Sequence, residues 1–289
     1  FLDEEVPYLR GLAKEVRDIS QRPEQEGKRN KWKEHNSLKG KEPMVFVYPD
    51  GAWTELLPDS ALRCKSELGR SLEHQLLVKL IRSKYVPDDV PIEGDIKFNK
   101  VIHNSMWGVS PHIIRPTENR GSWHCDPIIK KYSDWKQLKQ PVVEYDDAGT
   151  KKIYEAVGNA LGDILRPKQV GITDFGFHMM HWYCDYRELD NMMMDLMDEP
   201  EMVHDAIRFF TEGVKSMLKQ YEQLNLISLN NDDTFFYTGG VGYTDELPAE
   251  GFDPGRVRLC DVWGAAEAQE FSCISPAMHE EFILSYERE

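Results

Sequence analysis

Two histidines and a cysteine lie within seven residues in the stretch DFGFHMMHWYC, which runs from Asp174 to Cys184. His178, His181 and Cys184 are spaced three apart, so on a helix their side chains would fall near one face. Imidazole and thiolate are ligands that zinc prefers, so this spacing suits a metal site. The same residues can instead line a substrate pocket or pack as an aromatic part of the core. Spacing alone does not decide among these three interpretations.

A second group of chemically capable residues follows apolar runs that we interpret as buried strands. In an α/β barrel, catalytic and binding side chains lie at the carboxyl ends of the strands and in the loops that follow. Tryptophans, histidines, carboxylates and amides at one barrel mouth would form an aromatic-walled pocket with acid–base or metal-binding capacity. The residues expected to bind substrate there are Asp50, Trp53, Trp107, His178, His181, Asn231, Trp263 and Glu267.

Asp261 is the residue expected to carry the chemistry, and Asp233 is the second. Asp261 ends the apolar run VRLC and stands shortly before a glycine, so its carboxylate is expected at the barrel mouth. There it would orient the substrate as a hydrogen-bond acceptor or act as a general base. The alternatives are that Asp261 only caps the following helix and that the SLNNDD stretch around Asp233 is a polar turn.

Apolar runs alternate with segments of helical periodicity along the chain, which predicts an α/β fold with a parallel sheet. No GxGxxG or GxxxxGK[ST] loop follows any expected strand, so a (β/α)8 barrel is favoured over an open doubly wound sheet. We expect an N-terminal helical extension over residues 1–40 and a barrel domain over 41–289, incomplete at its C-terminal end. Strands are expected at 43–53, 95–108, 168–176, 226–233 and 257–264, and helices at 3–20, 26–40, 71–85, 146–163, 187–225 (broken near Pro200) and from Ser275 onward.

The net charge argues against two classes of partner, and the cysteine content indicates the redox compartment. The 289 residues include 50 acidic and 35 basic side chains, for a formal net charge of −15. This balance argues against nucleic acid or an anionic membrane as the main partner. Five dispersed cysteines without a CxxC pair indicate a reducing cytoplasm. The sequence shows no signal peptide and no apolar run that approaches the roughly 20 residues of a membrane span.

Three stretches resemble the uroporphyrinogen decarboxylase superfamily, in particular an uncharacterised bacterial branch. They are LCDVWGAAEAQEFSCISPAMHEEFILSYERE, LMDEPEMVHDAI and NKWKEHNSLKGKEPMVFVYPDGAW. The resemblance covers most of the chain and implies a (β/α)8 barrel. The superfamily contains cofactor-free decarboxylases and zinc-assisted methyltransferases that work with corrinoid proteins. An arginine-rich RQAGRY-like segment, typical of true porphyrinogen decarboxylases, does not occur here, which disfavours that reaction.

The resemblance therefore implies a methyltransferase or demethylase component that acts on a small methylated substrate with a corrinoid protein as partner. In that branch zinc is held by a His-x-Cys pair and a later Cys, which would lie beyond residue 289, and Asp261 would complete the set. Because these ligands come from later strands, a pocket role is favoured for His178 and His181. The alternatives are a cofactor-free decarboxylase-like lyase and a barrel that binds a small molecule or tetrapyrrole without converting it.

Overall fold

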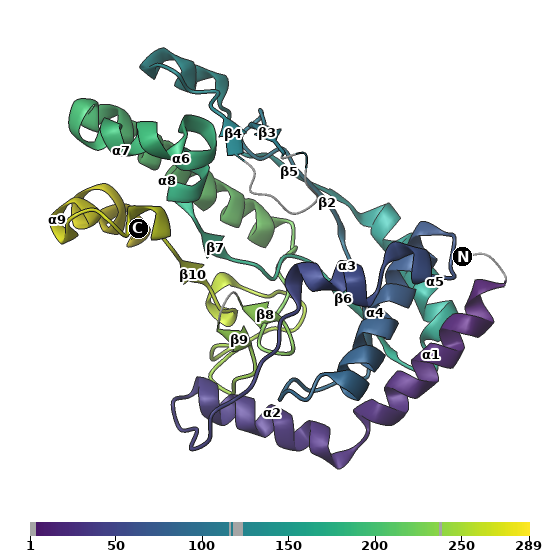
Figure 1. Ribbon diagram of the computed structural model, residues 1–289. Helices are drawn as coiled ribbons and strands as arrows, with labels where there is room; N and C mark the ends of the chain where they lie inside the picture. The colour runs from purple at the N-terminus through teal and green to yellow at the C-terminus, as the bar shows by residue number, and fades with distance from the viewer. Residues whose placement is uncertain (1–3, 116, 118–123, 237–238) are drawn as a thin grey trace. The chain divides into compact units, whose positions relative to one another are not determined.

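The computed structural model describes residues 4–115, 117, 124–236 and 239–289 (Figure 1). The chain is an α/β protein that divides into two compact units, each assembled from three separate segments. The predicted extension over residues 1–40 belongs to unit 1. Unit 1 consists of Phe1–Val101, Tyr145–Thr173 and Leu226–Trp263, and unit 2 of Ile102–Glu144, Asp174–Asn225 and Gly264–Glu289.

The helices of unit 1 follow the apolar periodicity of the sequence. α1 (Glu5–Ser20) buries Leu9, Ala13 and Val16 on one face, and this face packs against α4 (Glu67–Tyr85). Ser66 caps α4, because its hydroxyl accepts a hydrogen bond from the backbone of Gly69. The other helices are α2 (Pro23–Asn36), α3 (Trp53–Leu56) and α5 (Asp147–Leu161), with 3-10 turns at Asp50–Ala52, Asp59–Ala61 and Leu259–Asp261.

Unit 1 contains a parallel strand pair that carries charged side chains. β1 (Asp95–Asn99) pairs with β6 (Arg166–Val170), and the register sets Lys97 beside Lys168. Side chains alternate between the two faces of a strand. Ile96 and Phe98 on β1 are buried in the core with apolar residues of α1, α4 and α5, so Lys97 points to the opposite face. β8 (Phe235–Phe236) and β9 (Gly240–Val241) form an antiparallel pair.

Unit 2 is built around an aromatic core. α6 (Met179–Arg187), α7 (Leu189–Asp198) and α8 (Pro200–Gln223) pack together, with Pro200 at the start of α8 where the predicted break lies. β3 (His112–Ile114) pairs with β4 (His124–Asp126), and β7 (Gly176–Phe177) pairs in parallel with β10 (Ala265–Ala266). Unit 2 also contains 3-10 turns at Tyr132–Gln137 and Gln269–Phe271, α9 (Pro276–His279), a π-helical turn at Glu280–Leu284 and α10 (Ser285–Glu287). The residues of β2 (Val101–Asn104) and of β5 (Val143–Asp146) are divided between the two units.

Three expected strands are wrong, and side-chain hydrogen bonds explain two of them. In residues 43–53, all described, the backbone N–H groups of Val45 and Val47 donate to the carboxylates of Asp89 and Asp88 instead of to a strand. Residues 257–264 contain the 3-10 turn that ends at Asp261. Within 226–233, only Ile227 makes a strand-like bridge, to Ile172. The strands expected in 95–108 and 168–176 are confirmed in β1, β2, β6 and β7.

The strands of the described residues form two-stranded sheets, and none of these closes into a barrel. The (β/α)8 barrel therefore stays a prediction. Over residues 4–115, 117, 124–236 and 239–289, no helix combines the length and apolar character that a membrane crossing requires.

A buried carboxylate connects α4 to the chain that precedes it. Glu73 is fully buried and accepts hydrogen bonds from the backbone N–H groups of Arg63 and Cys64 and from the hydroxyl of Tyr8. Burial alone would raise the pKa of Glu73, but these donors outweigh it and lower the pKa below its usual 4.5. The stability gained is present above that value and is lost as pH falls through the lower pKa of the folded state.

We expect Glu73→Gln to lower the free energy of unfolding by about 1–3 kcal/mol, because an amide NH2 would face backbone donors that need an acceptor. Urea denaturation at pH 7 measures this change. Glu67→Gln, at an exposed position of the same helix, is the matched control and should leave the midpoint nearly unchanged. Equal midpoints for the two variants would contradict the role of Glu73.

Candidate functional site

A pocket of about 530 Å³ lies entirely within unit 1. One face of α4 contributes residues at helical spacing, from Ser71 to Arg82, and the segment from Val90 to Glu93 forms a further side. Lys97 and Asp233 present charged groups to the pocket, and Trp53 and other aromatic side chains line it. The volume falls in the range of roughly 300–1,000 Å³ that is usual for small-molecule sites.

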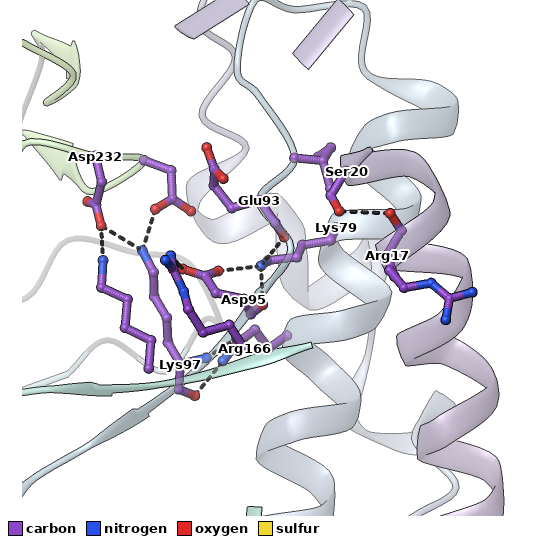
Figure 2. Close-up of polar contacts among 12 residues, drawn as sticks. Arg17, Ser20, Lys79, Glu93, Asp95, Lys97, Arg166 and Asp232 are labelled. Atoms are coloured by element: carbon purple, nitrogen blue, oxygen red, sulfur yellow. Dashed lines mark hydrogen bonds and ion pairs between the residues drawn. The ribbon is translucent and has the colours of Figure 1, made fainter. Parts of the chain in front are cut away.

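Lys97 lies between two neighbouring carboxylates. Its ammonium is 2.5 Å from Asp233 and 3.8 Å from Asp232, and Lys168 forms a second ion pair with Asp232. Figure 2 shows Lys97 extending from its strand toward Asp232. Thr234 donates to Asp232 through both its backbone N–H and its hydroxyl, which fixes the turn that holds the two carboxylates. The register of β1 and β6 thus brings two lysines to two aspartates.

Helix α4 positions this strand from the side. The side-chain amide of Gln75 donates to the carbonyl of Lys97 and accepts from its N–H, at 2.9 and 2.8 Å, as a paired strand would. Four residues later, Lys79 donates to the Asp95 carboxylate at 3.0 Å and to the carbonyls of Glu93 and Asp95 (Figure 2). These bonds fix the backbone from which Lys97 projects.

Burial and neighbouring charges move the pKa values of the two aspartates in opposite directions. Burial alone would raise the pKa of Asp232, but Lys97 and Lys168 outweigh it, and the pKa is lowered. Burial raises the pKa of Asp233; Lys97 opposes the rise, and the charges of Asp232 and Asp95 add to it. Desolvation would lower the pKa of Lys97, but Asp233 and Asp232 raise it to about 12. Of the two neighbouring aspartates, Asp233 is therefore the one that more readily holds a proton.

An aromatic wall, formed by Phe46, Tyr48 and Phe235, lines the same pocket. The rings of Tyr48 and Phe235 are stacked, with centroids 4.4 Å apart and planes 12° from parallel. Phe46 lies nearly parallel to both, 5.2 Å from Phe235 and 6.1 Å from Tyr48. Tyr48 and Phe235 remain 53% and 37% exposed, so part of each residue is accessible.

Of the three closely spaced residues His178, His181 and Cys184, the two histidines line one cavity of unit 2, and Cys184 lines a different cavity together with His181. α6 begins at Met179, so His181 and Cys184 are on the helix, and His178 directly precedes it. His178, His181 and Glu267 line a cavity of about 200 Å³ together with Gln269 and Glu270. The nearest pairs join His181 to Glu270 at 3.3 Å and His178 to Glu267 at 4.0 Å. Three of the residues expected to bind substrate thus line one cavity.

Asp261 has a different environment from the open barrel mouth that we expected. It is fully buried, and its two oxygens accept hydrogen bonds from the guanidinium and backbone N–H of Arg258 and from the N–H of Ala249. Arg258 lowers the pKa of Asp261, although burial opposes the shift. A zinc ligand at this position would have to give up the Arg258 pair, so this donor set does not fit a metal.

The remaining predicted residues are dispersed. Trp107 is buried in the core of unit 2, with the rings of Trp182 and Phe210 each 4.8 Å away, which leaves no open face for a substrate. The indole of Trp263 donates to the carbonyl of Gly242. The side chain of Asn231 donates to the carbonyl of Leu247, and Asp50 lies exposed in a 3-10 turn.

Lys97 and Lys168 were not predicted as site residues, although the sequence contains a signal for Lys97. In the strand DIKFN, charged Asp95 and Lys97 alternate with apolar Ile96 and Phe98, which predicts one charged face. Such a face on a strand with a buried opposite side indicates a lined pocket or an ion-pair network. Within the described part of the chain, no group of three or more His, Cys, Asp or Glu side chains is arranged to hold a metal ion.

No family model, curated protein or solved structure matches this chain. Membership of the uroporphyrinogen decarboxylase superfamily therefore stays a prediction. The side chains that line the pocket of unit 1 are the basis for a functional proposal.

We expect Asp261→Asn to destabilise the fold by about 1 kcal/mol or more, because buried donors of Arg258 and Ala249 lose a charged acceptor. Thermal unfolding of the variant measures this effect. Combining it with Arg258→Ala should give less than the sum of the two single effects, since both remove the same ion pair. Glu250→Gln, an exposed neighbour, is the control. A stable Asp261→Asn variant with strictly additive behaviour would contradict a structural role for this carboxylate.

Proposed function

We propose that the pocket of unit 1 is the active site of a cofactor-free lyase that decarboxylates a small carboxylic acid. The observation that carries this proposal is the Asp233 carboxyl, 2.5 Å from the ammonium of Lys97 in an aromatic-lined pocket. A lysine can bind the substrate carboxylate, and a neighbouring acid can supply the proton that replaces it. This is one of the two chemistries that the sequence resemblance implies.

The charges around the pocket favour a monoanionic substrate that arrives with a proton. Glu93 is paired with Arg29 and accepts a hydrogen bond from Tyr243, so it adds no net charge. A bound carboxylate would add one negative charge to a balanced group, and a proton on Asp233 restores the balance. Substrate binding would thereby protonate Asp233, the acid that later donates this proton to the substrate. The balanced group comprises the three largely enclosed cations, Lys79, Lys97 and Lys168, and three carboxylates, Asp95, Asp232 and Asp233. Arg166 also lies 3.9 Å from Asp95, but its side chain is 75% exposed, so solvent screens its charge.

The reaction consumes one proton and releases carbon dioxide. The bond between the substrate carbon and its carboxylate breaks, and its electron pair stays on the substrate. The proton of Asp233 forms the new C–H bond at that carbon, and Asp233 becomes ionised. Solvent then returns a proton to Asp233, and the role of Lys97 is to bind and orient the carboxylate. Gln75 acts as a positioning residue, because its amide fixes the backbone of Lys97.

Methyl transfer with a corrinoid protein is the second candidate. The aromatic wall favours it, because a methyl group on a small substrate would find apolar contact at Tyr48 and Phe235. Zinc would supply Lewis-acid activation of the methyl acceptor or donor when bound. We derive no step through zinc, because Asp261, the implied ligand in this chain, is engaged by Arg258.

We expect Asp233→Asn to slow carbon dioxide release, from a carboxylic acid that the wild-type protein decarboxylates, by about 100-fold or more. General acids contribute rate accelerations of this size. Wild-type affinity for the acid should fall by about tenfold per pH unit above the pKa of Asp233, since one proton accompanies each anion. The variant carries no such proton, so its affinity should not depend on pH in this range. Calorimetry in buffers of different ionisation enthalpy measures the proton uptake directly.

Asp198→Asn, an exposed substitution in unit 2, is the matched control and should retain wild-type turnover and pH dependence. Pocket binding without proton uptake, or full turnover by Asp233→Asn, would refute the assignment of Asp233 as the acid.

We expect no methylation of cob(I)alamin from a panel of methylated donors, whether or not zinc is supplied. Spectrophotometry of the corrinoid follows this reaction, and metal analysis of the purified chain gives its zinc content. Methyl transfer at stoichiometric zinc would instead establish the second candidate and displace the lyase.

A further inference from the structure

We infer that the acid bound in the pocket of unit 1 carries a flat aromatic ring, which stacks on Tyr48 and Phe235 while its carboxylate faces Lys97. This inference rests on the proposed function, because it names the substrate class of the same site. It adds a selectivity for ring shape, which decarboxylation of small acids does not itself require.

The aromatic wall is prepared for a further parallel ring. Tyr48 and Phe235 already stack at 4.4 Å with planes 12° apart, and both remain substantially exposed at the pocket. Aromatic rings prefer offset stacking on such faces to contact with water. The guanidinium of Arg82 lies 5.9 Å from the centre of the Phe46 ring and is paired with Asp88, which stabilises the wall from α4. A planar ligand could cover the exposed parts of Tyr48 and Phe235 without disturbing these contacts.

The polar groups of the pocket require that the ring carry an anion. Lys97 and Asp233 line the same cavity as Tyr48 and Phe235, so one small molecule can reach both. A neutral ring would leave the ammonium of Lys97 with its aspartates and gain stacking only. A carboxylate without a ring would gain the ion pair and leave the aromatic faces in contact with water. An aromatic carboxylate satisfies both parts of the pocket.

A ring also suits the chemistry assigned to Asp233. The proton of Asp233 adds to the ring carbon that bears the carboxylate, using a π electron pair of the ring. The bond to the carboxylate then breaks, carbon dioxide leaves, and its electron pair restores the aromatic ring. The ring is positively charged between these steps, and the faces of Tyr48 and Phe235 stabilise a cation at close contact.

The affinities of three probes separate the contribution of the aromatic ring to binding from that of the negative charge. Isothermal titration is carried out with benzoate, cyclohexanecarboxylate and benzyl alcohol on the full chain. Benzoate should bind about three- to tenfold more tightly than cyclohexanecarboxylate, the range that aromatic stacking supplies. It should bind at least about tenfold more tightly than benzyl alcohol, which lacks the charge. Tyr48→Leu should bring the ratio between the two acids close to one, whereas Tyr48→Phe should keep it.

Tyr85→Leu, a substitution at an exposed ring outside the pocket, should leave the ratio unchanged. Equal affinity of the wild-type chain for the two acids, or an unchanged ratio in Tyr48→Leu, would overturn the inference. Ring-selective binding without decarboxylation of any aromatic acid would remove the proposed function and support this inference. Decarboxylation of aliphatic acids without ring selectivity would support the function and overturn the inference.

Discussion

The ion pairs of Lys97 are the interaction on which the rest of the site depends. The parallel register of β1 and β6 places Lys97 directly beside Lys168, and two adjacent ammonium groups would repel each other. Asp232 and Asp233 compensate for that repulsion, and they hold the segment after Ile227 against the strand pair. Because Phe235 follows two residues later, the same contacts position the aromatic wall of the pocket.

A buried charged group of this kind is a poor way to obtain stability. The desolvation of several charges offsets most of the gain from pairing them, and apolar side chains of similar volume often stabilise a core as well or better. The cluster nevertheless lines a pocket and contains carboxyls whose pKa values move in opposite directions. Separated pKa values within one cavity are what acid–base chemistry requires. Function therefore explains this arrangement better than stability does.

Elements that depend on local sequence could be predicted well. The helices α1, α4, α5 and α8 follow apolar periodicity, and Pro200 marks the break between α7 and α8. The expected strand at 257–264 was wrong because an apolar run does not reveal the pairing of Asp261 with Arg258, which bends the chain. A tryptophan that follows an apolar run can face a pocket, as Trp53 does, or a core, as Trp107 does. Only long-range packing distinguishes the two.

The site itself could be predicted in part. Asp233 and Trp53 were identified from their positions after apolar runs, and both line the pocket. Lys97 and Lys168 are 71 residues apart, and only the strand register makes them neighbours. His178, His181 and Glu267 in unit 2 were all expected to bind substrate, but neither their shared cavity nor its geometry follows from spacing.

The protonation state of Asp233 tests the central claim most directly. Carbon-13 NMR of protein labelled at the aspartate carboxyl carbon resolves individual titrations, and the Asp233 signal is the one that disappears in Asp233→Asn. The account predicts that Asp233 titrates above the usual 3.8, while Asp232 titrates below it. An Asp233 signal that titrates at or below 3.8 would show a permanently ionised partner of Lys97 and would contradict its role as the proton donor.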